Sequence, residues 1–174
     1  MQGALRLTAE LMAVAAKTAP KGKGQDCVAI QVLEGAQVQA LAEGMAAYGR
    51  KRGKAQGYDR DGANVAASGA VVLIGLRQAP AAGLDCGACG FETCAQMSAA
   101  KPVRSDFKGP QCAVRVLDMG IALGSAVKTA SLLNVDNRIM YRIGAAARDM
   151  GLVDWDFAMG IPLSVSSKSI YFDR

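Results

Sequence analysis

The first apolar pattern along the chain has the spacing of an amphipathic helix. Over residues 4–18, four apolar side chains fall on one helical face and predict its buried stripe: Leu7, Leu11, Val14 and Ala15. Pro20 ends this helix, and a basic, glycine-rich loop follows over residues 20–24. The chain is therefore expected to begin with a helix that packs against another layer.

Two further patterns predict strands. Residues 27–33 alternate between apolar and other positions, which is typical of a strand. Residues 70–76 are apolar almost throughout, which indicates a strand buried on both faces of a sheet covered by helices. Near the end of the chain, residues 158–165 and 169–172 are predicted as closing strands.

The remaining segments are predicted mainly as helices. Helices are expected over residues 35–52, 113–133 and 138–150, and the first of them has its own apolar stripe: Val38, Leu41, Met45 and Ala46. Residues 54–64 are polar and rich in glycine, so we predict a loop there. These elements predict a layered α+β fold, with residues 1–174 forming one domain.

Four cysteines carry the strongest chemical signal. Cys86, Cys89 and Cys94 lie close together, and Cys112 follows after seventeen residues. Four converging thiolates repel one another unless a cation lies among them, so an iron–sulfur cluster or a zinc ion is expected. We predict that residues 83–112 form a metal-binding module inserted between a strand and a helix.

The spacing favours iron over zinc. Zinc ribbons usually pair two C-x2-C knuckles and this chain has one, while the order of spacings also differs from bacterial and plant-type ferredoxins. Gly87 and Gly90 each follow a cysteine, where backbone amides can approach sulfur, and Phe91 can shield one face. We therefore predict a [4Fe–4S] cluster, with zinc as the alternative. Cys27 is expected to be a small buried side chain.

Composition excludes several other chemistries. The chain has no histidine, which excludes Ser-His-Asp catalysis, histidine-bound zinc and a Rieske-type centre. The formal net charge is +5, partly from the basic run at residues 50–54. No aromatic residues interleave with that run, so we interpret it as a solvated helix end and expect no nucleic-acid partner.

We expect a cytoplasmic protein without a membrane span. The first residues carry no secretory signal pattern, and no apolar run approaches the ~20 residues that a transmembrane helix requires. The cysteines are clustered and odd in number, which is unlike a disulfide framework.

The cysteine segment resembles known iron–sulfur motifs. Cys-Gly-x-Cys-Gly-Phe-x-x-Cys is similar to the [4Fe–4S] motif of the Rnf electron-transport B subunit and of the corrinoid iron–sulfur protein. The whole chain resembles a bacterial and archaeal family described by its ferredoxin domain. The matching stretches include residues 18–24, 71–75, 118–125, 135–140 and 160–174.

A more distant resemblance concerns the fold. Residues 15–32, the helix that starts at Asp118, and Gly160-Ile-Pro-Leu are similar to segments of nitroreductases. This resemblance implies a nitroreductase-like mixed sheet flanked by helices, a homodimer and FMN as a second cofactor. The small residues at Gly120 and Gly124 suit a helix that contacts a second copy.

The flavin site departs from the nitroreductase pattern. The usual phosphate-binding arginine motif is absent and only Arg6 lies near its place, while Pro20-Lys-Gly-Lys-Gly-Gln25 replaces the Pro-Ser-x-x-Asn loop. The resemblance would then assign the flavin phosphate to Lys21, Lys23 and Arg174.

Two functions remain open from the sequence besides a zinc-stapled structural protein. The first is an iron–sulfur oxidoreductase in which FMN converts single electrons to two-electron chemistry. The second is an electron carrier or interaction module without flavin or substrate, whose basic surface meets an acidic redox partner protein. No residue is assigned a catalytic role.

Overall fold

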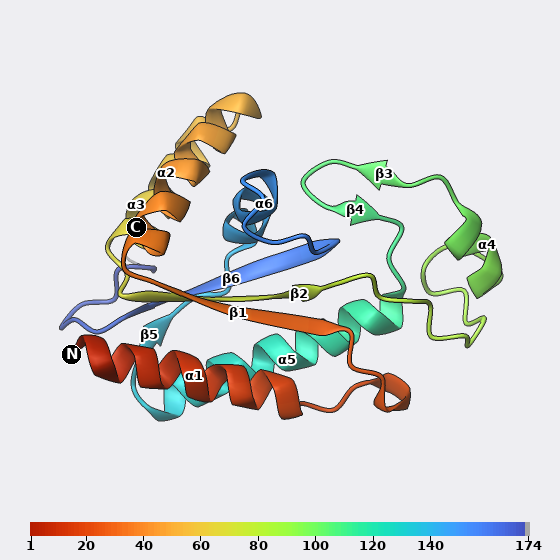
Figure 1. Ribbon diagram of the computed structural model, residues 1–174, viewed down its shortest axis with the longest axis horizontal. Coiled ribbons are helices and arrows are strands. Elements are labelled where there is room, and N and C mark those ends of the chain that lie inside the picture. The colour runs from red at the N-terminus through yellow and green to blue at the C-terminus, as the bar shows by residue number, and fades with distance from the viewer. Residues whose placement is uncertain (173–174) are drawn as a thin grey trace.

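A four-stranded sheet forms the centre of the molecule in a computed structural model that describes residues 1–172 (Figure 1). The strands follow the spatial order β1 (Val28–Glu34), β2 (Ala70–Leu76), β6 (Phe157–Ser164) and β5 (Asp136–Asn137). Each neighbouring pair is antiparallel. The expected α+β class is confirmed, whereas the expectation of a mixed sheet is wrong for the described residues, whose ladders in this sheet all run antiparallel.

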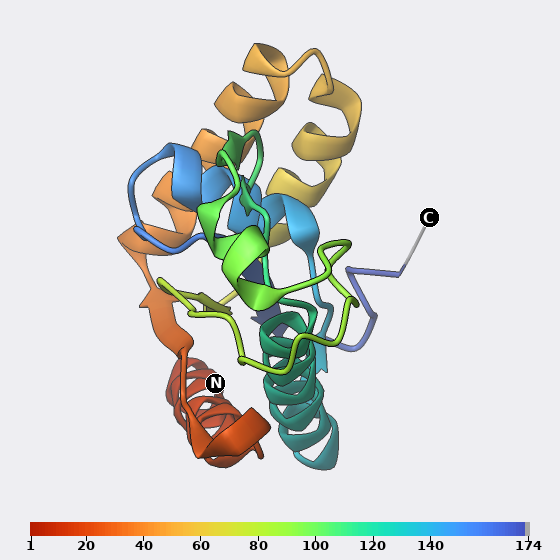
Figure 2. The same cartoon turned by 90° about the vertical axis from the view of Figure 1, so that its right-hand side faces the viewer.

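Helices cover both faces of this sheet. One face carries α1 (Gln2–Thr18) and α5 (Ala113–Leu132), and the other carries α2 (Ala36–Lys51), α3 (Ala55–Ala66) and α6 (Tyr141–Asp149). Figure 2 shows the two helical layers above and below the strands. Every residue of β2 is buried, as its continuous apolar run predicts.

The helix at the N-terminus ends where predicted and starts two residues earlier, but it packs with the opposite face toward the sheet. Its buried side chains are smaller or more flexible than the predicted stripe: Leu5, Thr8, Ala9, Met12 and Ala16. Leu7, Leu11 and Val14 are instead 56%, 41% and 59% exposed. Both faces of α1 are apolar, and its alanine-rich face packs inward because small side chains let the helix approach the sheet and α5 closely.

Three other predictions are corrected. Residues 55–64 of the predicted loop belong to helix α3, because Tyr58 and Val65 bury one face of it against α2. The helix expected from residue 138 starts at Tyr141, after the short strand β5. Residues 169–172 form bends and irregular chain rather than a strand, and Tyr171 is buried beside Ser68.

Glycine allows α6 to approach the sheet closely. A Cβ atom at Gly144 would lie 1.8 Å from the carbonyl oxygen of Ala158 on β6. A Cβ at Gly160 on β6 would in turn lie 2.0 Å from the Ile143 side chain. Since the first contact is with backbone, which cannot rotate away, the α6–β6 packing requires glycine at residue 144.

We therefore expect Gly144→Ala to lower the free energy of unfolding by about 3 kcal/mol, as overpacking of a buried contact does. Chemical denaturation measures this change. Gly3→Ala is the control, because a Cβ there meets no atom within 4 Å and should change stability by less than ~0.5 kcal/mol. Equal stability of the two variants would contradict this close packing.

The cysteine segment connects β2 to α5 and forms one end of the molecule. It contains the short helix α4 (Cys94–Ala99) and a small hairpin of β3 (Val103–Arg104) and β4 (Lys108–Gly109). Figure 2 views the molecule from this end, with α4 in front. Within residues 1–172, no helix is both long and apolar enough to traverse a membrane.

Candidate metal centre

The four predicted cysteines line one cavity. Cys86, Cys89, Cys94 and Cys112 all face it, and apolar neighbours such as Phe91 complete its wall. Their exposure differs: Cys86 is exposed, Cys89 and Cys94 are partly buried, and Cys112 is buried. The cavity is narrow, and no three Cys, Asp or Glu side chains of residues 1–172 are grouped closely enough to hold a metal ion. The structure thus brings the four thiols to one site without joining them at one point.

Glycine gives the first cysteine loop its curvature. Gly83, Gly87 and Gly90 have φ angles of 68°, 73° and 86°, in the left-handed region that side chains rarely adopt. The amide of Gly90 donates to the carbonyl of Gly87 at 2.9 Å, which closes a tight turn around Cys89. The glycines that follow cysteines in the sequence therefore serve the backbone path of the loop.

Cys94 is fixed by the start of a helix. Thr93 caps α4 by accepting a hydrogen bond from the Gln96 amide, and the Gln96 side chain accepts one from the Thr93 amide. The amide of Cys94 donates to Asp85 Oδ1 at 2.7 Å, across the loop that carries Cys86. Asp85 thereby joins the two halves of the cysteine loop, a role that the sequence analysis did not identify.

Cys112 lies immediately before α5, at the end of the module. Burial would raise the pKa of its thiol, but the backbone amides of Ala82, Arg115 and Val114 and the Arg115 charge outweigh burial and lower the pKa. A lowered pKa favours the thiolate, which is the form that binds metals. Cys27, just before β1, does not line the cavity, and it is partly rather than fully buried.

The cysteine segment is held to helices α2 and α6 through Asp106. This residue lies at the tip of the β3–β4 hairpin, and its carboxylate accepts hydrogen bonds from Tyr48 on α2, at 2.5 Å, and from Tyr141 on α6. Arg52 lies 3.2 Å from the same carboxylate, and Arg148 donates to the Asp106 carbonyl. Asp106 of the cysteine segment therefore joins helices α2 and α6 of the sheet-and-helix frame, meaning the central sheet and the helices that cover it.

These contacts lower the pKa of Asp106. Burial opposes the charged form, but hydrogen bonds from Tyr141 and Tyr48 and the positive charge of Arg52 outweigh it. The pKa of Asp106 is therefore below the unfolded value of about 3.9. The stabilisation is fully present above that unfolded pKa and is lost as the pH falls through the folded pKa.

We expect Asp106→Asn to lower the free energy of unfolding by about 2 kcal/mol, because hydrogen bonds to a charged acceptor are replaced by weaker ones. The difference from the native protein should be full near neutral pH and shrink as the pH falls below about 4. Denaturation at several pH values measures it. Asp59→Asn is the control, since Asp59 is exposed on α3. The role of Asp106 is refuted if both variants show the same pH dependence.

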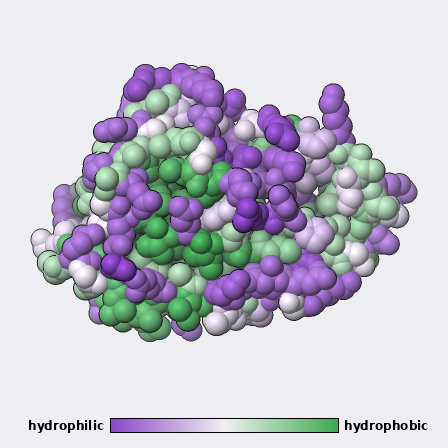
Figure 3. Space-filling model, in the orientation of Figure 1, coloured by the Kyte–Doolittle hydropathy of each residue, from purple (hydrophilic) through white to green (hydrophobic). Residues whose placement is uncertain are grey.

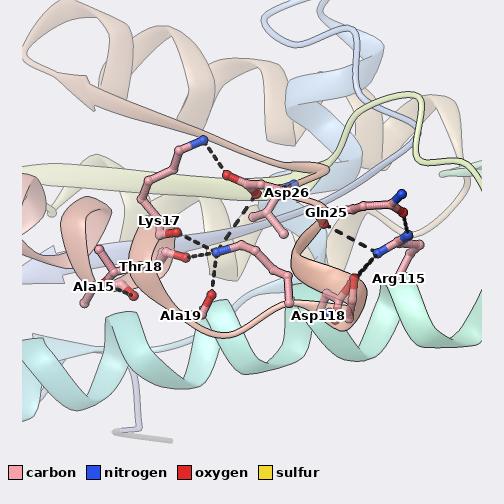
Figure 4. Close-up of polar contacts among 12 residues, drawn as sticks. Ala15, Lys17, Thr18, Ala19, Gln25, Asp26, Arg115 and Asp118 are labelled. Carbon is pink, nitrogen blue, oxygen red and sulfur yellow. Dashed lines mark hydrogen bonds and ion pairs between the residues drawn. The ribbon is translucent and has the colours of Figure 1, made fainter. Parts of the chain in front are cut away.

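The loop assigned to flavin uses one of its two lysines internally (Figure 4). The Lys21 ammonium donates to the carbonyls of Ala16, Lys17 and Ala19 at 2.9, 2.6 and 2.8 Å, at the end of α1. Its side chain is only 5% exposed and also lies 4.0 Å from Asp26. Lys21 therefore has no free donor directed toward a phosphate.

The rest of this loop is tied to α5. The amide of Gly22 donates to Asp118 Oδ1 at 2.7 Å, and the Gly22 carbonyl accepts a hydrogen bond from Arg115 at 3.0 Å. Lys23 remains exposed, near Gly83 at the start of the cysteine loop. Arg174 lies outside the described residues. With one exposed lysine and the Asp118 carboxylate beside it, the described loop does not fit a flavin phosphate.

The family follows from comparison with related sequences. Residues 108–174 match the family described as "Uncharacterized protein containing a ferredoxin domain (DUF2148)", a region that includes Cys112 but starts after the other three cysteines. An uncharacterized protein of Archaeoglobus fulgidus is 44% identical over 173 residues, which cover 98% of this chain and 91% of the relative. The chain belongs to this ferredoxin-domain family.

Solved structures confirm the fold expected from the nitroreductase resemblance. The FMN-dependent nitroreductase NfnB of Mycobacterium smegmatis superimposes with a TM-score of 0.63 at 12% identity, covering 97% of this chain and 82% of that one. The nitroreductase CinD of Lactococcus lactis gives a TM-score of 0.58 at 14% identity, covering 97% and 84%. The chain therefore has a nitroreductase-like fold.

Proposed function

We propose that this protein is an iron–sulfur electron-transfer protein that binds one [4Fe–4S] cluster through Cys86, Cys89, Cys94 and Cys112. The main support is the single cavity that these four residues line. The donors are all sulfur, the usual ligand set of a [4Fe–4S] cluster, and the lowered pKa of Cys112 favours the ligating form. The ferredoxin domain of the family supports the same class of function.

The chain's own residues would hold the cluster and limit its contact with water. A bound cluster supplies one-electron chemistry, which no side chain in this cavity provides. Phe91, Met97 and Val114 belong to the small apolar cluster around Cys112 and Cys89, so they would cover the inner side. Cys86 is exposed, so the side of the cavity at Cys86 faces solvent and is the natural route for electrons to a partner.

A nitroreductase-like fold alone is not sufficient reason to propose that this protein binds flavin. NfnB is described as FMN-dependent, but Lys21 is used at the end of α1 and the neighbouring loop is bound to Arg115 and Asp118. We therefore favour an electron carrier without FMN over a flavin-dependent oxidoreductase.

A basic surface beside the module suits an acidic redox partner. Arg52 donates to Ser105 of the module at 3.0 Å, which places the end of α2 against the β3–β4 hairpin. Exposed cations lie on both segments: Arg50, Lys54, Lys101 and Arg104. Such charges speed association with an oppositely charged protein and make it sensitive to salt.

The decisive experiment counts iron, sulfide, zinc and flavin in protein purified without oxygen. We expect about four irons and four sulfides per native chain, with no stoichiometric zinc or FMN. Serine at Cys86, Cys89, Cys94 or Cys112 should lower the iron and sulfide content, because serine does not supply a thiolate. Cys27→Ser is the matched control and should keep the full content, since Cys27 lies outside the cavity.

Other results would reject parts of the proposal. Colourless native protein with one zinc per chain would replace it by a zinc-stapled structural protein. Full iron together with one FMN per chain would favour the flavin-dependent oxidoreductase instead. Equal loss of iron in Cys27→Ser and in the cavity variants would reject the assigned ligands.

We also propose a homodimer formed through the outer face of α1 and α5. These two helices pack side by side beneath the sheet. The exposed apolar residues of α1, noted above, are matched on α5 by a stripe at helical spacing: Leu117, Gly120, Ile121 and Gly124. Nothing lies within 4 Å of a Cβ at either glycine, so a second helix has room to approach. Figure 3 shows apolar surface also over β1 and along α1.

Ile121→Glu should convert a dimer into a monomer, because it places a charge at the centre of the apolar stripe on α5. Sedimentation velocity measures the change. Ala47→Glu adds the same charge to an exposed position on α2 and should remain dimeric. Monomeric native protein, or a dimeric Ile121→Glu variant, would contradict the interface.

A further inference from the structure

Arg115 is a fully buried cation beside the proposed cluster. It lies in the first turn of α5, three residues after Cys112, and its relative exposure is 0%. Residues three apart on a helix are neighbours, so the Arg115 charge acts on the Cys112 sulfur. No other arginine among residues 1–172 is buried to this degree.

The guanidinium group connects three segments of the chain. It donates to the Pro80 carbonyl at 3.2 Å, just before the cysteine loop, and to the Gly22 carbonyl at 3.0 Å. It also contacts the side chain and carbonyl of Gln25 and lies 3.1 Å from Asp118 Oδ2. Figure 4 shows Arg115 between Gln25 and Asp118.

Stability alone does not account for this arrangement. Removing an arginine from water costs several kcal/mol, and apolar residues of similar volume often stabilise a protein at least as well as a buried ion pair. Asp118 is the single carboxylate that contacts Arg115, and the other partners are neutral oxygens. The ion pair is formally neutral, but Arg115 lies three residues after Cys112 and Asp118 lies six, so the positive member is the nearer of the two to Cys112 along α5.

We propose that Arg115 is a positioning residue that fixes the start of α5, next to Cys112, against Pro80 and Gly22, and that its charge raises the reduction potential of the cluster, while Asp118 opposes the effect on the potential. This inference rests on the proposed function. Reduction adds one electron from a redox partner to the cluster, without forming or breaking a bond to the protein. The added negative charge is stabilised by a nearby fixed cation and destabilised by a nearby carboxylate, and net charge and hydrogen bonds are known determinants of cluster potential.

Besides its effect on the reduction potential, Arg115 also holds the loop of residues 20–25 in place. Gly22 is bound by Arg115 through its carbonyl and by Asp118 through its amide. The loop that would meet flavin in a nitroreductase is thus held by the Arg115–Asp118 pair on α5. A change at Arg115 should therefore alter both the potential and the protease resistance of this loop.

The test compares charge variants of the reconstituted protein by redox titration followed with EPR. Arg115→Met should shift the reduction potential to more negative values, and Asp118→Asn should shift it to more positive values. Arg115→Lys keeps the charge and should stay closer to the native potential than Arg115→Met. Limited proteolysis should cut the 20–25 loop faster in Arg115→Met than in the native protein.

A second ion pair provides the matched control. Arg142 on α6 lies 2.7 Å from the buried Asp61 on α3, on the opposite face of the sheet. Arg142→Met and Asp61→Asn remove the same charges there and should leave the potential unchanged. Matching shifts in these controls would overturn the proposal.

Two further outcomes separate the possible failures. Native protein without iron and sulfide would reject the proposed function itself. Native protein with a full cluster, whose potential does not move in Arg115→Met or Asp118→Asn, would reject only the role of Arg115 in setting the potential. If Arg115→Met fails to keep its cluster, the opposite shift expected in Asp118→Asn still decides the electrostatic effect.

Discussion

Bringing four thiols to one cavity is the constraint on which the rest of this end of the molecule depends. A small apolar cluster lies around Cys112, and polar contacts and glycine set the path of the cysteine loop beside it. Asp85 binds the Cys94 amide, glycines reverse the backbone, and α5 fixes Cys112 at its first turn. Asp106 then holds the returning hairpin against two helices of the frame. Cys94 and Cys112 are thus positioned by the starts of two different helices, and Cys89 by the glycine-rich loop.

The sheet and its covering helices could be predicted from sequence wherever the pattern of apolar residues is compatible with only one arrangement. Strand β2 is apolar throughout and is buried throughout, so its position between two helical layers follows directly. Helix α1 is apolar on both faces, and periodicity alone does not tell which face packs inward. Helix α3 contains two glycines and many polar residues, but the burial of Tyr58 and Val65 against α2 outweighs their low helix propensity.

The candidate site was only partly visible in the sequence. The spacing of the cysteines predicted which residues share a site, since three of them lie within nine positions. The residues that support the site were missed because their partners are distant in sequence: Asp106 bonds Tyr48, and Arg115 bonds Gly22. Arg115 did carry a signal, because Arg115 and Asp118 are opposite charges three residues apart in a mostly apolar helix. Nothing in the sequence indicated the role of Lys21, because its hydrogen bonds to backbone carbonyls depend on the path of the chain at the end of α1.

The position of the module has a consequence for how the chain folds during synthesis. The module and α5 separate β2 from β6, which is its neighbour in the sheet, so that Val72 pairs with Ile161. All four cysteines therefore leave the ribosome before the sheet can be completed. At that stage one edge of β2 is still unpaired, and its apolar side chains are not yet covered by β6 and the helices. Pairings over such long separations form slowly. A fully apolar strand and four thiols are thus exposed together over the same interval of synthesis.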